Sequence, residues 1–167
     1  MFEKYFESQS LFFTGQVGRS NGKNSFAASH FNHSLRLNSD NQDARYAYIT
    51  LNISAINTAI ASGRLNLGLQ LIGDTRRLDT KDQFVNQLHF LRGMLLAKAD
   101  RPIEAEREFK AAISKDETYF LALVNLAGRY VTRLNRLEEA EKLYRKALLL
   151  NPTKEERMAV KNALRRL

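Results

Sequence analysis

Apolar residues recur at helical spacing along most of the chain, and polar segments interrupt the pattern near Asn21, Ser62, Asp100 and Asn135. Apolar positions three and four residues apart are typical of helices that bury one face. The interruptions carry residue types that are typical of turns. No segment has the alternating pattern of a strand, and both prolines fall at helix boundaries. The pattern therefore predicts an all-α chain with turns near these four residues.

The second half of the chain repeats itself at an interval of 35 residues. Each copy carries a glycine, a small residue, an aromatic residue and another small residue, in that order: Gly93, Ala105, Phe109 and Ala112, then Gly128, Ala140, Tyr144 and Ala147. Small residues at these places let two helices pack closely. A period of this length indicates one supersecondary unit stacked on copies of itself.

Residues 121–152 resemble the tetratricopeptide repeat (TPR), a helix–turn–helix unit of about 34 residues. Gly128 matches the glycine of the first helix, Ala140 and Tyr144 match the second helix, and Pro152 matches the closing proline. The preceding copy keeps the pattern but ends on Glu117 in place of proline.

The resemblance extends towards the N-terminus in a weaker form. Two earlier segments offer a small, a large and a small residue at the same spacing: Ala27, Phe31 and Ser34, then Gly68, Ile72 and Thr75. The TPR resemblance implies a single domain, a right-handed helical-hairpin solenoid of about four repeats. The expected units are residues 2–41, 42–82, 83–120 and 121–153, followed by a capping helix at 154–167.

Two capping boxes are predicted from the sequence. Thr153 and Glu156 should begin the capping helix, and Thr80 and Gln83 should begin the first helix of the third unit. A terminal helix with one apolar face is expected because the last repeat of an array has no neighbour to cover it.

The net charge of +8 is concentrated in the second half of the chain. Residues 1–85 hold nine Lys/Arg and seven Asp/Glu, whereas residues 86–167 hold seventeen and eleven. Opposite charges at helical spacing, such as Glu106–Lys110, Glu141–Arg145 and Glu138–Lys142, indicate solvated helix surfaces. Basic-surface binding of nucleic acid remains an alternative, although acidic residues are interleaved throughout.

Chemistry-bearing motifs are scarce. The chain has no cysteine, so neither a disulfide nor a thiolate zinc site is possible. His30 and His33 could share a helix face but lack a carboxylate in register, so no metal site is predicted. His89 stands alone, and neither a nucleophile motif nor a phosphate-binding loop accompanies it. The sequence therefore favours a non-enzymatic protein without a cofactor.

The TPR resemblance implies a scaffold or adaptor that binds a partner peptide or helix in a concave groove lined by the first helix of each unit. Helical geometry places one set of side chains on that inner face. The predicted groove residues are Ile53, Asn57, Gln87, Phe90, Met94, Lys98, Asn125, Arg129 and Arg133. Cations at the C-terminal end of this set would favour an acidic side chain or a free carboxylate of the partner.

A further alternative is that the chain is the soluble TPR segment of a larger enzyme or of an envelope or secretion assembly. We expect a cytoplasmic protein if the chain is complete and an envelope-associated or periplasmic one if it is an excised domain. No apolar run is long enough for a transmembrane helix. The sequence leaves the identity of the partner and the oligomeric state open.

Overall fold

The computed structural model describes residues 2–167, which form α-helices joined by short turns and contain no strand. The helices of this range are α1 (Phe2–Ser20), α2 (Asn24–Leu37), α3 (Gln42–Ala61), α4 (Leu65–Leu78), α5 (Val85–Lys98), α6 (Pro102–Lys115), α7 (Phe120–Thr132), α8 (Leu137–Leu148) and α9 (Lys154–Leu164). The prediction of an all-α chain is confirmed.

The four turns lie where the sequence predicts them. The backbone takes a left-handed conformation at Gly22, Gly63, Asp100 and Asn135, each within one residue of a predicted turn or at it. Glycine adopts positive φ without steric cost, and Asp and Asn tolerate it better than other residues. Each of these residues therefore separates the two helices of one hairpin.

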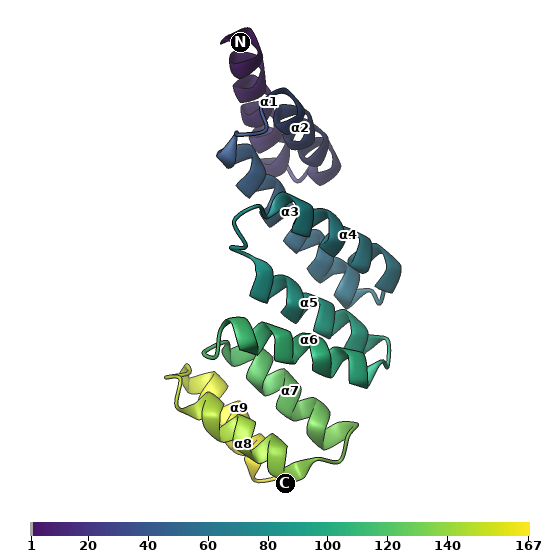
Figure 1. Ribbon diagram of the computed structural model, residues 1–167, viewed down its shortest axis with the longest axis vertical. Helices are drawn as coiled ribbons and strands as arrows, with labels where there is room; N and C mark the ends of the chain where they lie inside the picture. Colours follow the sequence, from purple (N-terminus) through teal and green to yellow (C-terminus); the bar gives the residue numbers. More distant parts are fainter. Residues whose placement is uncertain (1) are drawn as a thin grey trace.

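Consecutive helices pack as hairpins, and the hairpins stack along one direction (Figure 1). The pairs are α1 with α2, α3 with α4, α5 with α6, and α7 with α8. The first helices also contact one another from pair to pair, because α3 touches both α1 and α5 and α5 touches α7. The result is an elongated solenoid with the N-terminus at one end and α8 and α9 at the other.

Glycine and an aromatic ring meet inside two of the hairpins. A Cβ atom placed on Gly15 would lie 2.7 Å from the Phe31 ring, and one on Gly93 would lie 2.7 Å from the Phe109 ring. Both rings are fully buried, so the hairpin can close only where the facing helix has no side chain. In the second hairpin, Ile56 occupies the equivalent place on α3. Its partner helix carries an aliphatic residue instead of an aromatic one there.

The apolar interior is divided among neighbouring units. The largest cluster joins α5, α6, α7 and α8 through residues such as Phe109, Leu126 and Tyr130. Val160 of α9 enters this cluster with 1% of its surface exposed. The C-terminal helix thus covers the last hairpin, as predicted for a capping helix.

One predicted capping box is present and the other is wrong. The Thr153 hydroxyl accepts from the Glu156 backbone N–H, and the Glu156 carboxylate accepts from the Thr153 N–H. By contrast, α5 begins at Val85 without a side-chain cap from Phe84. The buried Asp79 carboxylate instead accepts the backbone N–H groups of Gln83 and Phe84.

Candidate interaction surface

The predicted groove residues lie on α3, α5 and α7 or at their ends. We call this set the inner surface: Ile53 and Asn57 on α3, Gln87, Phe90, Met94 and Lys98 on α5, and Asn125, Arg129 and Arg133 on or directly after α7. Asn57, Lys98 and Arg133 are exposed, and the other members are half-buried. Because α5 contacts both α3 and α7, the three groups are adjacent along the array.

Phe90 and Met94 pack partly against the apolar interior. The Phe90 ring lies 6.0 Å from the Phe109 ring and 5.3 Å from the Tyr119 ring, centre to centre. Met94 packs against the same C-terminal cluster. Their exposed edges can still form an apolar floor, but Phe90 is held in place by aromatic contacts and is not a freely projecting anchor.

The side-chain amides of the inner surface differ in whether they form hydrogen bonds within the protein. The Asn125 side chain donates to the backbone carbonyl of Leu121 at 2.8 Å, which occupies its amide N–H but leaves its oxygen available. Within residues 2–167, no hydrogen bond involves the side chain of Gln87 or Asn57. These amides can therefore pair with the backbone of a bound chain.

The three cations do not share one environment. Arg133 pairs with Asp100 in the turn between α5 and α6, at 3.2 Å. In the described part of the chain, neither Lys98 nor Arg129 forms an ion pair. Arg133 therefore already has an acidic partner, which comes from the turn of the neighbouring hairpin. Lys98 and Arg129 remain available to an outside carboxylate.

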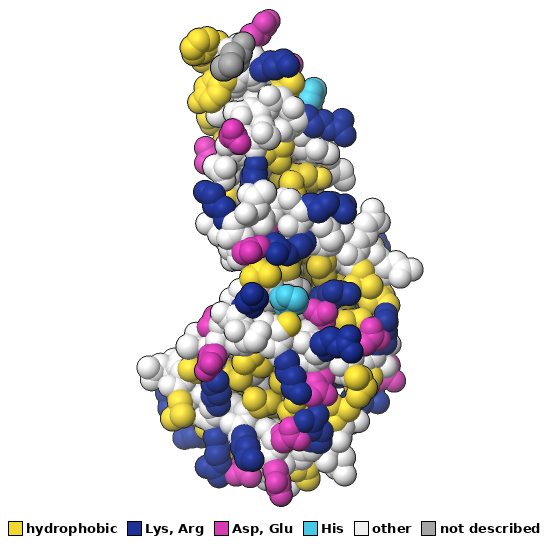
Figure 2. Space-filling view, viewed as in Figure 1, with side chains coloured by type: hydrophobic (Ala, Val, Ile, Leu, Met, Phe, Trp, Pro, Cys, Tyr) yellow, Lys and Arg dark blue, Asp and Glu magenta, His cyan; other side chains and the backbone are white. Residues whose placement is uncertain are grey.

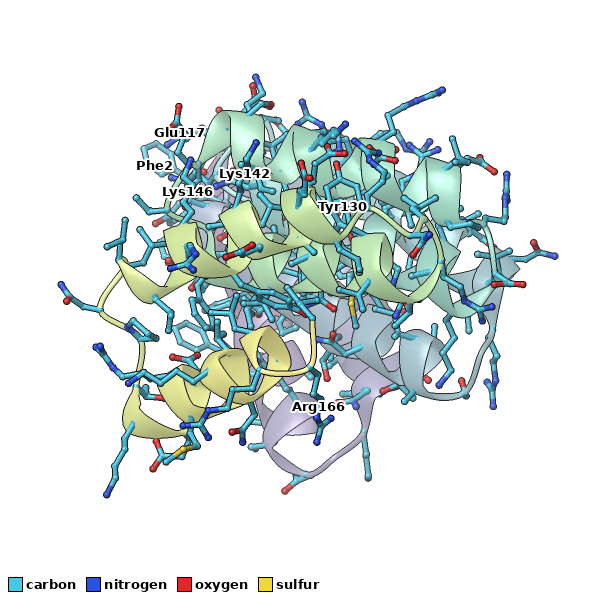
Figure 3. The ribbon with its side chains drawn as sticks, turned by 90° about the horizontal axis from the view of Figure 1, so that it is seen from below. Phe2, Glu117, Tyr130, Lys142, Lys146 and Arg166 are labelled. Carbon is cyan, nitrogen blue, oxygen red and sulfur yellow. The ribbon has the colours of Figure 1, made fainter. Side chains whose placement is uncertain are left out.

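A hollow of about 420 Å³ lies on a different side of the molecule, between α6 and α8 with α7 at its floor. Figure 3 shows Glu117, Lys142 and Lys146 along its rim and Tyr130 farther along the same side. Its apolar lining comes from Ile113, Leu126 and Leu143. Lys146 is paired with Glu117 across the rim at 3.2 Å.

A buried ionic network adjoins this hollow. The Glu106 carboxylate accepts from the Tyr130 hydroxyl at 3.0 Å and from the Arg136 guanidinium at 2.8 Å, and it pairs with Lys110 at 2.6 Å. The same guanidinium lies 4.1 Å from the centre of the Tyr130 ring. Glu106 is only 8% exposed, so it is not part of a solvated helix surface as predicted.

The ionisation of this network follows from its contacts. Burial raises the pKa of Glu106, but hydrogen bonds from Lys110, Arg136 and Tyr130 outweigh it and hold the pKa below its usual value. The hydrogen bond to Glu106 raises the pKa of Lys110. Burial, aided by the bond to Glu106, raises the pKa of the Tyr130 hydroxyl. Glu106 therefore stays ionised and binds its partners at neutral pH.

Of this network, the sequence identified only the Glu106–Lys110 pair, because Tyr130 and Arg136 lie 24 and 30 residues from Glu106 along the chain. A tyrosine at position 130, where the preceding copy has Leu95, was the only available signal. It places a hydroxyl group at a position that is apolar in the preceding copy.

His30 and His89 have ordinary structural partners. His30 bonds through Nδ1 to the backbone carbonyl of Phe26 at 2.9 Å. His89 lies 2.7 Å from the Glu108 carboxylate, which also pairs with Arg92 at 3.2 Å. No group of three or more metal-ligating side chains occurs in residues 2–167. Nor does any helix of that range combine the length and the apolar character needed to cross a membrane.

No family model matches the chain, and no curated protein matches it in sequence. Solved structures do match it. The TPR domain of P58(IPK) has a TM-score of 0.60 and 15% identity over 96% of this chain, which spans only 45% of that domain. TTC0263, a TPR protein of Thermus thermophilus, has a TM-score of 0.53 and 21% identity, with 94% of this chain and 98% of that one covered.

The chain has the TPR fold. A further TPR structure, YrrB, is described as having an unusual peptide-binding site, and it matches with a TM-score of 0.56 and 18% identity over 91% of this chain and 90% of that one. At identities this low, the structural likeness shows the fold alone, and the partner must be argued from this chain's own residues.

Proposed function

We propose that this chain is a protein-interaction module that holds a segment of a partner protein against the inner surface of α3, α5 and α7. The TPR fold supports this proposal because stacked hairpins present a long continuous surface. The peptide-binding site named for YrrB is a second support, although it belongs to that protein.

The proposal rests on two basic side chains that lie on neighbouring first helices and have no acidic partner. Lys98 is exposed at the end of α5, and Arg129 is half-buried on α7. Neither is paired within residues 2–167, whereas Arg92, Arg133 and Arg136 are. A half-buried guanidinium without a carboxylate is the kind of group that gains most from an incoming anion.

The chemistry of the surface limits what the partner carries. Met94 and the edge of Phe90 provide an apolar floor beside these cations, and the amides of Gln87 and Asn57 stand along it. A partner segment with one apolar side chain next to an acidic residue or a free carboxylate satisfies these groups together. Each charged hydrogen bond of this kind contributes about 1–3 kcal/mol when partly desolvated.

Nucleic-acid binding is less well supported by the same charges. Many basic side chains of the C-terminal half are paired with carboxylates, including Arg101, Lys110 and Arg145. A phosphate-binding surface needs unpaired cations along a continuous track. Retention on heparin at physiological salt would argue for this alternative.

The test compares two double variants as bait in a pull-down read by mass spectrometry. Lys98→Ala with Arg129→Ala removes the free cations. Arg107→Ala with Lys115→Ala removes two exposed basic residues of α6 and serves as the matched control. Arg133 is left unchanged because its pairing with Asp100 links two hairpins.

We expect the wild type and the α6 control to capture the same protein and the Lys98/Arg129 variant to lose it. Titration of that protein at two salt concentrations should show a weaker salt dependence for the Lys98/Arg129 variant. Equal capture by all three baits, with equal melting curves, would contradict the proposed binding surface.

A further inference from the structure

The N-terminal helix exposes an apolar stripe in two parts, which the polar Gln9 and Ser10 separate. Phe2, Phe6, Phe13 and Val17 are 83%, 68%, 62% and 60% exposed, and Tyr5 beside them is 49% exposed. Spacings of 4, 7 and 4 residues place the first four on one side of α1. Figure 2 shows hydrophobic side chains gathered at this end of the molecule. Exposed apolar patches of this kind are often functional.

The register of the repeats identifies what kind of surface this is. Phe13 and Val17 lie two residues before and after Gly15. The same places around Gly93 hold Leu91 and Leu95. Around Gly128 they hold Leu126 and Tyr130, and these four residues are at most 3% exposed.

These equivalent residues are buried by the hairpin that precedes them. Leu91 and Leu95 form a cluster with Ile72 of α4, and Tyr130 bonds to Glu106 of α6. On α3, the first helix of the second hairpin, Ser54 and Thr58 occupy the same two positions and stay exposed. The apolar side chains Phe13 and Val17 of α1 thus match two positions that a neighbouring helix covers in the third and fourth hairpins, where these positions are also apolar or aromatic.

The available area is enough for an interface. Aromatic side chains bury about 150–250 Å² each, so the exposed parts of the stripe amount to roughly 600 Å². Two such surfaces together give roughly 1,200 Å², which is the lower limit for specific, stable interfaces. A single added side chain or a small ligand would leave most of this stripe in water.

Charge favours a second copy of the same chain as the occupant. Residues 1–41 carry four Lys/Arg and three Asp/Glu, for a net +1, whereas residues 42–167 carry twenty-two and fifteen, for +7. Two copies therefore meet with least mutual repulsion at their N-terminal ends. Glu3 lies in the first turn of α1, followed by Lys4 and then Glu7, and the basic Arg19 lies in the last turn. An antiparallel arrangement brings unlike ends of the two helices together.

We propose that two copies associate through α1, packed antiparallel about a two-fold axis near Gln9 and Ser10. In this arrangement Phe6 faces Phe13 of the second copy and Phe2 faces Val17 of the second copy. The interface is self-complementary, so it closes at two copies. It uses a different face from the inner surface and goes beyond the proposed function.

The first test measures molar mass by light scattering after gel filtration, from low to high micromolar protein. We expect the wild type to reach twice the chain mass and Phe6→Glu with Phe13→Glu to remain at the chain mass, with the dissociation constant raised by about a hundredfold or more. Ile103→Glu changes an equally exposed apolar residue on α6 and should leave the dimer intact. Circular dichroism verifies that each variant is folded.

A cross-linking test checks the geometry, which is possible because the chain has no cysteine of its own. Gln9→Cys should cross-link two copies with a short bismaleimide, since it lies near the axis. Glu3→Cys should not, because antiparallel helices separate its two copies by about 20 Å. The proposal would be overturned if the wild type were monomeric or formed a larger assembly than a dimer. It would also be overturned if Ile103→Glu dissociated the dimer as much as Phe6→Glu with Phe13→Glu does, or if Glu3→Cys cross-linked and Gln9→Cys did not.

Discussion

Two junctions in this molecule are joined by buried polar groups of opposite kinds. At the N-terminal junction, Ser8, Ser34 and Asn41 connect α1, α2 and the start of α3 without any charge. At the C-terminal junction, Glu106, Tyr130 and Arg136 connect α6, α7 and the start of α8 through ions. The same architectural task is performed once by neutral hydrogen bonds and once by a salt-bridge network.

The neutral network is closed on itself. The Ser8 and Ser34 hydroxyls each donate to the other residue's backbone carbonyl, at 3.0 and 2.8 Å. The Asn41 amide donates to both hydroxyls at 3.1 Å, and its oxygen accepts the Ala44 N–H at the start of α3. Every strong donor and acceptor of these side chains has a partner, which is what makes burial tolerable.

The ionic network is instead open to its surroundings. Glu106 is buried, but the side chains of Lys110 and Arg136 remain about half and one third exposed. The outer ends of the cations keep contact with water, which limits the cost of desolvation. The comparison teaches that one architecture can join its hairpins through polar groups that differ both in position and in charge: Ser34 corresponds to Ala112 in the third unit, and Glu106 corresponds to Ala28 in the first. Three of the four predictions that follow test this difference, and the other compares one glycine position in two copies of the repeat.

The largest expected effect is that of Glu106→Ala. This change leaves the Tyr130 hydroxyl without its partner and Arg136 without its buried carboxylate, so it should destabilise the protein by about 2–3 kcal/mol. Glu104→Ala on the same helix removes a partly exposed carboxylate paired with Arg101 and should cost less than about 0.5 kcal/mol. Urea unfolding of both variants gives the comparison, and equal midpoints would show that the network is not a stabilising connection.

Asn41→Ala should have the next largest effect, about 2 kcal/mol. It removes the N-cap of α3, which contributes about 1 kcal/mol, and leaves two buried hydroxyls without a donor. Asn38→Ala removes an amide whose oxygen accepts a single exposed backbone N–H, and it is the matched control. A loss no greater than that of the control would mean that water replaces Asn41.

Local pattern predicted the helices, the turns and the packed hairpins, because these depend on residues close in sequence. The glycine and aromatic positions, such as Gly93 with Phe109, lie within one hairpin and follow from spacing alone. The capping role of Asp79 was not predicted. Its carboxylate, in the loop before α5, accepts the backbone N–H groups of Gln83 and Phe84, where Thr80 and Gln83 were expected to form a capping box.

The polar junctions could not be predicted in the same way. Ser34 matches the repeat as a small residue, and nothing local shows that its hydroxyl meets Ser8, 26 residues away. Arg133 was assigned to the inner surface by helical geometry, and only the fold brings Asp100 beside it. Patterns in one chain fix which face a residue lies on, whereas its partner depends on how the hairpins stack.

The third prediction compares the same glycine in two copies of the repeat. A methyl group on Gly93 would meet the buried Phe109 ring at 2.7 Å, whereas one on Gly128 would lie 3.7 Å from the Tyr144 hydroxyl. Gly93→Ala should therefore cost about 1–2 kcal/mol. Gly128→Ala should stabilise the helix by about 0.5–1 kcal/mol. Thermal melts of the two variants should shift in opposite directions, and a shift in the same direction would contradict this account.

The smallest effect, and the sharpest test of the comparison, concerns pH. The pKa of Glu106 is lower in the folded protein than in the unfolded chain, so its stabilisation is present above the unfolded value of about 4.3 and disappears as pH falls through the folded value. Glu106→Gln keeps the shape of the side chain and one acceptor oxygen but loses the charge, so at pH 7 it should cost about 1 kcal/mol. That cost should shrink on acidification, because the wild-type carboxylate then becomes neutral too.

Asn41 does not titrate, so the cost of Asn41→Ala should be the same at pH 7 and in acid. Urea unfolding of the wild type and both variants at each pH cancels the acid effects that they share. A cost of Glu106→Gln that stays constant with pH would mean that the C-terminal junction, like the N-terminal one, depends on hydrogen bonds and not on charge.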